Sequence, residues 1–175
     1  ACTDCNAGYY AAEGSFGAAG CVECPAGYHD DDSDPATSCD GVGTASQCAV
    51  GRYTAAGGTG CTDCAAGQYD HDNDASTNCH TCAAGKYSSA GVTTCTACVA
   101  GFTDADSDAS TQCTECEAGR HSAVGTTSCT DCPAGKADLT GTDANTVCTS
   151  CTAGQYAAVN STVCTDCVAG QYNAI

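Results

Sequence analysis

Apolar positions in this chain recur in a short repeated pattern around pairs of cysteines, instead of following a helical or a long strand period. Nine cysteine pairs have the form C-x-x-C, and the tenth pair, Cys39 and Cys48, has the same form widened by six residues. The third residue after each pair is always Gly; Ala precedes that Gly in nine of the ten repeats, and Tyr follows two residues later in six. An always-Gly position indicates a turn with positive φ or a close approach of another backbone segment. Because no stretch has helical periodicity, the pattern predicts short strands and turns without helices.

The loop between successive pairs alternates in length, which predicts a tandem array. From residue 25 onward, short loops have 12 residues and long loops have 14 or 15, so that a two-loop unit recurs every 34 or 35 residues. Repeats of this kind stack so that each contacts its neighbours, and we expect residues 1–175 to form one continuous array of about ten repeats in an elongated rod. The insertion at 40–47 is a candidate kink or surface loop. Both ends of the chain cut through a repeat, so we expect the array to continue beyond them.

Composition argues against an ordinary apolar core. The chain has 20 Cys but only 14 residues of Leu, Ile, Val and Phe together, and it has no Met or Trp. Such a low content of large apolar side chains would otherwise indicate disorder, whereas a Cys content above about 10% marks a disulfide scaffold. Disulfides form and persist in oxidising compartments. We therefore expect a small disulfide-rich tandem-repeat fold in a secreted, extracellular or cell-surface protein.

Two disulfide connectivities use the cysteine pairs, and sequence alone does not decide between them. In a ladder, the second Cys of each pair joins the first Cys of the next, which leaves the first and the last cysteine to pair elsewhere. In an interlaced arrangement, two bonds such as Cys79–Cys95 and Cys82–Cys98 close one module. The recurrence of Gly and the aromatic residue within every loop favours the ladder. Its bonds would be Cys5–Cys21, Cys24–Cys39, Cys48–Cys61, Cys64–Cys79, Cys82–Cys95, Cys98–Cys113, Cys116–Cys129, Cys132–Cys148 and Cys151–Cys164.

The charge of the chain narrows the choice of partners. The formal net charge is −17, with only four Lys and Arg residues. Nucleic acids and anionic membrane surfaces bind proteins through Lys and Arg, so we expect neither as a partner, and cations are the favoured small ligands. No run of 18 apolar residues is present, so we expect no membrane span in this fragment. The expected partners are further copies of the chain, other extracellular proteins or glycans.

Three of the long loops carry Asp at the first, third and fifth positions of an acidic segment. Carboxylates spaced in this way can converge within a turn and offer the hard oxygen ligands that Ca²⁺ prefers. The segments lack the Gly and the closing Glu of an EF-hand, and the fourth long loop retains only Asp138 and Asp143. A solvated acidic turn explains the same pattern without a ligand. The candidate Ca²⁺ ligands are Asp30, Asp32 and Asp34, Asp70, Asp72 and Asp74, and Asp104, Asp106 and Asp108.

Other chemical motifs are weaker. The C-x-x-C pairs also match a zinc-ribbon spacing, but the expected oxidising compartment favours disulfides. His29 and His121 replace Tyr in the repeat, which predicts a packing role. His71 and His80 lie in or beside one acidic loop, and a metal role is the less favoured interpretation for them. Asn160 begins an N-x-S/T sequon and is a candidate glycosylation site. No Ser/His/Asp, phosphate-binding or apolar-carboxylate motif supports catalysis, so we expect the protein not to be an enzyme.

One resemblance follows from the repeat. The segment Cys82-Ala83-Ala84-Gly85-Lys86-Tyr87, closed by Cys95-Thr96-Ala97-Cys98, resembles the ephrin-receptor-like cysteine-rich repeat and is similar to the first loop of tumour-necrosis-factor-receptor modules. Long arrays of such repeats resemble surface proteins of protists and algae, including ciliate surface antigens. The resemblance covers the whole chain and implies an extended, extracellular and non-enzymatic fold. The strict alternation of loop lengths and the acidic loops depart from the receptor modules.

These observations predict an extracellular structural or adhesive protein that forms a rigid rod in a cell coat, filament or flagellar hair, with Ca²⁺ as a candidate stabilising ion. The alternative is a receptor or adhesin ectodomain that binds a specific protein partner. A regular array favours the structural hypothesis because each repeat presents the same surface. A contact site at the 40–47 insertion would favour the alternative.

Overall fold

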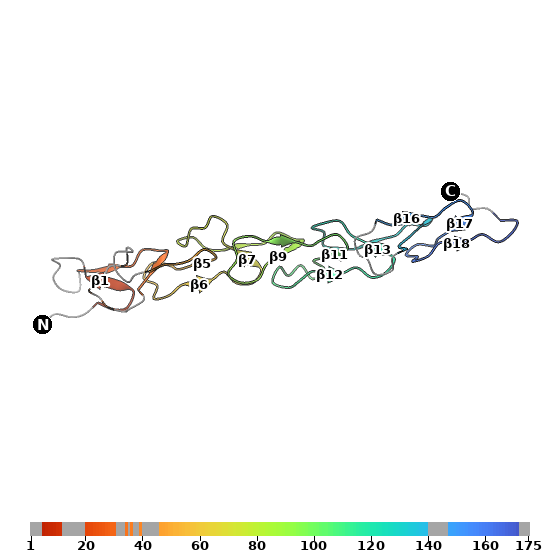
Figure 1. Cartoon of the computed structure of the whole chain (residues 1–175). Helices are drawn as coiled ribbons and strands as arrows, with labels where there is room; N and C mark the ends of the chain where they lie inside the picture. The colour runs from red at the N-terminus through yellow and green to blue at the C-terminus, as the bar shows by residue number, and fades with distance from the viewer. Residues whose placement is uncertain are drawn as a thin grey trace. The chain divides into compact units, whose positions relative to one another are not determined.

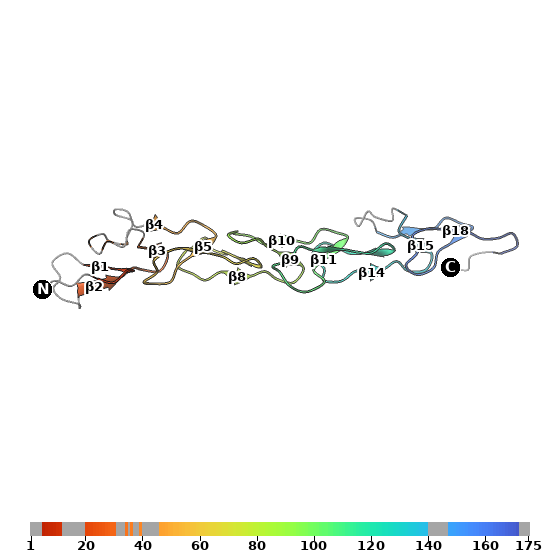
Figure 2. The ribbon, with the colours of Figure 1, turned by 90° about the horizontal axis from the view of Figure 1, so that it is seen from below.

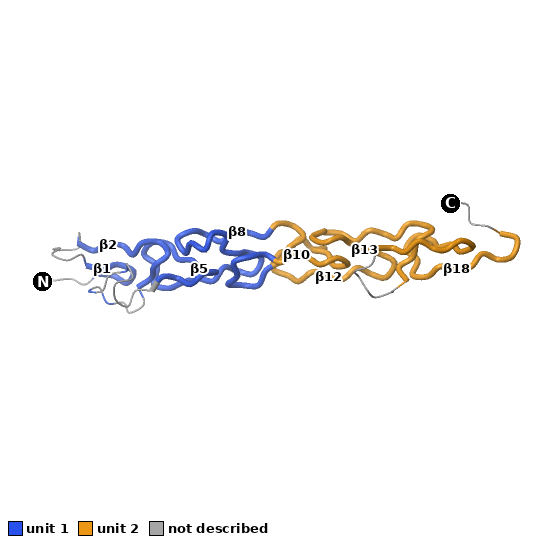
Figure 3. The backbone as a smooth tube through the Cα atoms, turned by 45° about the horizontal axis from the view of Figure 1, so that its top comes forward, with its two compact units in different colours: residues 1–82, 88–95 blue, residues 83–87, 96–175 orange. Residues whose placement is uncertain are grey.

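The computed structural model describes residues 5–11, 20–30, 34, 36, 39, 46–139 and 147–171. Contacts between residues divide the chain into two compact units, which Figure 3 colours separately: residues 1–82 with 88–95, and residues 83–87 with 96–175. Each unit is a succession of two-stranded hairpins (Figures 1 and 2). The continuity of the array from one unit into the next stays a prediction.

Within its described residues, the first unit contains four antiparallel hairpins. Each joins a strand just after the repeated Gly to a strand that lies between the two cysteines of the next pair. The hairpins are β1 (Tyr9–Ala11) with β2 (Cys21–Glu23), β3 (Tyr28–His29) with β4 (Ser46–Gln47), β5 (Arg52–Tyr53) with β6 (Thr62–Asp63), and β7 (Gln68–Tyr69) with β8 (His80–Thr81).

The second unit contains five hairpins of the same kind. They are β9 (Lys86–Tyr87) with β10 (Thr96–Ala97), β11 (Phe102–Thr103) with β12 (Thr114–Glu115), β13 (Arg120–His121) with β14 (Thr130–Asp131), β15 (Lys136–Ala137) with β16 (Thr149–Ser150), and β17 (Gln155–Tyr156) with β18 (Thr165–Asp166). No helix occurs in the described part of the chain. The predicted class of small disulfide-rich repeats with short strands and turns is therefore confirmed.

Nine disulfides close successive loops, and their pairing is that of the ladder. We number these loops in chain order: loop 1 (5–21), loop 2 (24–39), loop 3 (48–61), loop 4 (64–79), loop 5 (82–95), loop 6 (98–113), loop 7 (116–129), loop 8 (132–148) and loop 9 (151–164). Cys167 has no disulfide partner among the described residues, and Cys2 lies outside them. No bond joins Cys79 to Cys95 or Cys82 to Cys98, so the interlaced alternative does not apply.

Each loop opens with the same turn, which the repeated Gly makes possible. In loop 5 the Lys86 N–H donates to the Ala83 carbonyl at 3.1 Å, and Gly85 between them has φ of 79°. A bond from the fourth residue to the first with Gly at positive φ in the third position matches a type II turn. The Gly85 carbonyl then accepts the Cys98 N–H at 2.9 Å, which ties the turn to the start of the next loop.

Cysteines and small side chains form the core. Cys24, Cys64 and Cys132 are fully buried, Cys98 is almost so, and Thr103 is the largest side chain that is fully buried. Most of the repeat tyrosines in the described residues are half-buried. Such a core contains little apolar area, so the disulfides carry the stabilisation that large side chains supply in ordinary domains.

The insertion is shorter than the sequence indicates. Ser46 and Gln47, which we counted within 40–47, form β4 and pair with His29 and Tyr28. They therefore occupy the place that the two residues of an ordinary C-x-x-C hold in the other hairpins. The additional residues are 40–45, which lie outside the described part of the chain.

Candidate functional site

The first Asp of each acidic segment joins two loops. In loop 4, Asp70 accepts a hydrogen bond from the Gly51 N–H of loop 3 at 2.9 Å, and in loop 6 Asp104 accepts one from the Gly85 N–H of loop 5 at 3.0 Å. Both carboxylates are buried, with exposed fractions of 5% and 6%. Asp30 and Asp138 are buried and accept from Gly8 and Gly119 in the same way.

Odd-numbered loops make the same junction with a backbone carbonyl. Their residue at the position of this Asp is small, and its carbonyl oxygen accepts the Gly N–H of the preceding loop. These bonds join Gly27 to Thr54, Gly67 to Ser88, Gly101 to Ser122, and Gly135 to Ala157, at 2.9–3.1 Å. Successive loops within each unit are therefore joined alternately by an aspartate side chain and by a main-chain carbonyl.

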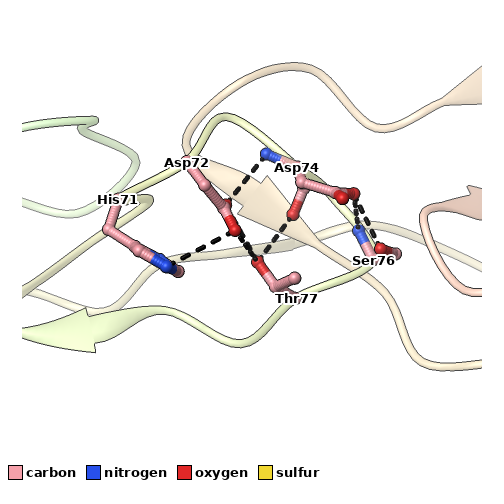
Figure 4. Close-up of polar contacts among 5 residues, drawn as sticks. All are labelled: His71, Asp72, Asp74, Ser76 and Thr77. Atoms are coloured by element: carbon pink, nitrogen blue, oxygen red, sulfur yellow. Dashed lines mark hydrogen bonds and ion pairs between the residues drawn. The ribbon is translucent and has the colours of Figure 1, made fainter.

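The second and third aspartates of loop 4 shape the tip of the loop (Figure 4). The Asp72 carboxylate accepts the Asp74 N–H at 3.1 Å and the Thr77 hydroxyl at 3.0 Å. Asp74 accepts both the N–H and the hydroxyl of Ser76, at 2.9 and 2.7 Å. Asn73 between them has a positive φ of 58°, a conformation that Asn tolerates better than most residues. We call this arrangement the acidic tip.

Loop 6 has an acidic tip with the same hydrogen bonds. Asp106 accepts the Asp108 N–H and the Thr111 hydroxyl, each at 3.0 Å, and Asp108 accepts the N–H and the hydroxyl of Ser110. In loop 2 the corresponding bond that the structure describes runs from the Ala36 N–H to Asp34 at 2.9 Å. The acidic tip is thus present in loops 4 and 6, and the described residues of loop 2 contain one of its hydrogen bonds.

Hydrogen bonds in both tips favour the ionised carboxylates. The Asp74 backbone N–H lowers the pKa of Asp72, and the Ser76 side chain lowers the pKa of Asp74. In loop 6 the Asp108 backbone N–H lowers the pKa of Asp106. The Ser110 side chain in turn lowers the pKa of Asp108. Both tips therefore present pairs of charged, solvent-exposed carboxylates at neutral pH.

The structure gives the first Asp of each acidic segment a different role from the other two, whereas the calcium hypothesis treated all three as ligands. It brings the third and fifth positions together in each tip, while Asp70 and Asp104 are engaged by the preceding loop. Asp32 lies outside the described residues. Calcium binding at the tips stays a prediction, with two carboxylates per tip as its best-placed ligands.

Two groups of three metal-ligating side chains occur among the described residues, with donor atoms within 4.8 Å of one another. Each consists of a histidine and the two cysteines of one disulfide: His29 with Cys48–Cys61, and His121 with Cys132–Cys148. Metals bind cysteine as thiolate, so the disulfides occupy these sulfurs. The His Nδ1 atoms lie 3.3 Å from Cys61 Sγ and 3.1 Å from Cys148 Sγ, which places both rings against the disulfide of the following loop.

The candidate glycosylation site has a structural role at the tip of loop 9. Asn160 has φ of 61°, and its N–H donates to the Cys132 carbonyl at 3.0 Å. With the amide oriented to satisfy its neighbours, Nδ2 donates to Asp131 at 3.1 Å and to the Gly119 carbonyl at 3.2 Å. A glycan would replace one of these two hydrogens. Glycosylation of Asn160 stays a prediction, and it would compete with one of the two bonds.

Comparison with known proteins adds no assignment. No family model matches the chain, and a search of curated proteins finds no similar one. Within the described residues, no helix has the length and apolar character needed to cross a bilayer. The junctions and the acidic tips are therefore the features of the chain that bear on its function.

Proposed function

We propose that this chain is part of an extracellular structural repeat protein that assembles with copies of itself or with other extracellular proteins. The observation that supports the proposal is the loop junction, in which the repeated Gly N–H of loops 1 to 8 donates to the same position of the next loop. An element that contacts its neighbour in the same way each time extends a scaffold without creating a unique cleft. This is the property that a coat or filament component requires.

The disulfides support an extracellular location. Nine disulfides close successive loops of a chain with few large apolar residues. Reducing compartments do not maintain such bonds. A fold that depends on them would lose most of its stabilisation in the cytosol.

Charge sets the conditions under which assembly occurs. The net charge of −17 makes copies of the chain repel one another. Salt screens such repulsion over about 8–10 Å at physiological ionic strength, and divalent cations at the acidic tips would reduce it further. We therefore expect assembly to increase with ionic strength and with added Ca²⁺.

Electron microscopy and sedimentation of the oxidised protein test this proposal, over a range of protein, NaCl and CaCl₂ concentrations. Filaments or sheets that form as salt or Ca²⁺ rises support it, and the reduced and alkylated protein should form none. Monodisperse monomers under all conditions, together with tight binding to one partner, would overturn it.

A receptor or adhesin ectodomain is the second candidate, and the insertion favours it. Residues 40–45 interrupt an otherwise regular repeat and would give one position a surface of its own. Deleting residues 40–45 joins Cys39 directly to Ser46, which restores the C-x-x-C form of the other repeats. Assembly that persists in the deletion variant favours the structural function. Loss of cell or partner binding with assembly intact favours the ectodomain.

A further inference from the structure

Two histidines of loop 4 stack on each other at the surface. The rings of His71 and His80 have centroids 3.7 Å apart and planes inclined by 9°. Both residues are exposed. Their imidazole nitrogens are therefore close to each other and accessible to solvent, unlike those of His29 and His121, which lie against disulfides.

The hairpin fixes the backbone on both sides of this pair. His80 belongs to β8 and pairs with Tyr69 of β7, two residues before His71. Asp70, directly before His71, is held by its N–H bond to the Val92 carbonyl at 3.0 Å and by its side-chain bond from Gly51. The two Cα positions are thus set by the fold, and only side-chain torsions remain free.

The Asp72 carboxylate lies beside His71 and offers a third donor group (Figure 4). Its Oδ2 lies 3.4 Å from Nε2 of His71. The Asp74 N–H and the Thr77 hydroxyl orient this carboxylate. Outer hydrogen bonds of this kind hold metal-ligating carboxylates in place and contribute to metal affinity.

Loop 6 is a natural control for this arrangement. Its acidic tip has the same hydrogen bonds as that of loop 4. The positions of His71 and His80 are Ala105 and Thr114 there. The two histidines therefore occur together in one hairpin, whereas the acidic tip occurs in both.

We propose that loop 4 binds a divalent transition-metal ion, with Zn²⁺ as the reference ion, through His71, His80 and Asp72. Imidazole nitrogens and a carboxylate oxygen suit Zn²⁺, and water completes its tetrahedral shell. The three donor atoms are not among the groups that already lie within 4.8 Å of one another. Binding therefore requires the two exposed rings to rotate out of the stack toward one ion. The two histidines distinguish this site from the proposed Ca²⁺ site, with which it shares Asp72, and it does not depend on the proposed function.

A Zn²⁺ titration of the oxidised, tag-free chain without added Ca²⁺ tests the proposal, by calorimetry and by NMR of the four histidine rings. We expect one Zn²⁺ per chain, with resonance shifts at His71 and His80 and not at His29 or His121. The variant His71→Ala with His80→Thr, which introduces the residues of loop 6, should lower the affinity at least about tenfold. Its nine disulfides, checked by mass, show that it folds.

The reverse substitution provides an independent test. Ala105→His with Thr114→His places the same pair beside the tip of loop 6, and the stoichiometry should rise from one Zn²⁺ to two. The proposal is overturned if the wild-type chain binds no Zn²⁺, if the loop 4 variant binds it unchanged, or if the loop 6 variant gains no second site.

Discussion

At the scale of single residues, the repeated Gly can be required for two reasons, its positive φ and the close approach of another loop. Substitutions can separate the two. Gly85 and Gly154 both have positive φ, 79° and 86°. A Cβ at Gly85 would overlap the Gly125 carbonyl oxygen, whereas a Cβ at Gly154 meets no atom within 4 Å. We expect Gly154→Ala to lower the free energy of unfolding by about 1–2 kcal/mol through its φ alone. Gly85→Ala should lower it by about 1–3 kcal/mol more. Amide hydrogen exchange across the second unit measures both, and equal losses would contradict the close approach.

Substitutions of a buried junction aspartate should differ in cost according to whether they keep an acceptor for the Gly N–H. Asp104→Ala leaves the Gly85 N–H without its acceptor and should cost about 1–3 kcal/mol, seen as faster exchange of the Gly85 amide. Asp104→Asn keeps an oxygen in place and should cost less. Ser122→Ala is the control, because Gly101 donates to the Ser122 backbone carbonyl, which the substitution retains. Unchanged exchange at Gly85 in Asp104→Ala would show that this junction does not need the carboxylate.

The sequence predicted the turn at the repeated Gly, but it did not reveal the role of the first Asp. Positive φ at Gly follows from its chemistry and its fixed place in the repeat. The partner of Asp104 is Gly85, 19 residues earlier in another loop, and local spacing contains no information about it. A signal was present, because Asp138 remains in the long loop that lacks the rest of the triplet.

At the scale of the loop, the aspartates of the acidic tips should stay ionised at a lower pH than ordinary aspartates do. Hydrogen bonds lower the pKa of Asp72 and Asp106 in the folded chain, from about 3.9 for an unfolded Asp. A lowered pKa gives stability that is fully present above about pH 4 and is lost as the pH falls through the folded pKa. Carboxyl NMR titration should place both transitions below the usual Asp range. Thr77→Val removes a donor to Asp72 and should raise its pKa alone, with Asp106 as the internal reference.

Calcium binding is a separate prediction for the same element. Asp72→Asn with Asp74→Asn preserves acceptors for the backbone N–H groups and removes the charge of one tip. We expect the wild-type tips to bind Ca²⁺ with Kd of about 10⁻⁴–10⁻³ M, and the variant to lose binding in loop 4 while loop 6 keeps it. NMR shifts of Ser76 and Ser110 amides during a Ca²⁺ titration distinguish the loops. If neither amide resonance shifts at millimolar Ca²⁺, the tips do not bind Ca²⁺ and are solvated turns.

Short strands and turns were predictable at this scale, whereas their pairing into hairpins, their boundaries and their junctions were not. A motif of Gly followed by an aromatic residue and then a cysteine pair predicts a short strand on each side of a loop. The same reasoning counted Ser46 and Gln47 as inserted residues, because β4 is recognisable only from its pairing with Tyr28 and His29. The stacked pair His71 and His80 was missed for a similar reason, since nine sequence positions separate two rings that lie in contact.

For the whole molecule, composition was the most informative property. Twenty cysteines and few large apolar residues predicted the disulfide-rich fold class. Connectivity was not determined, because both the ladder and the interlaced arrangement use the same C-x-x-C pairs. What separates them in the structure is geometry: each loop closes on itself around its own turn, so the cysteines at its two ends meet.

Proteolysis tests this connectivity across the whole chain. Lys86 lies inside loop 5, and in the ladder a cut after it leaves Cys82–Cys95 as the single disulfide that joins the two parts of the chain. In the interlaced arrangement two bonds, Cys79–Cys95 and Cys82–Cys98, would cross the same cut. Digestion of the non-reduced protein with a lysine-specific protease, then with an aspartate-specific one, leaves Cys79 and Cys82 on one fragment and Cys95 and Cys98 on another. In the ladder these two fragments are linked to each other and to the fragments that contain Cys64 and Cys113, in one species of four fragments. Mass spectrometry identifies this species. If Cys79 is instead linked to Cys95 and Cys82 to Cys98, the two fragments are linked only to each other. That result would contradict the ladder, and with it the closed loops between which the Gly–Asp junctions form.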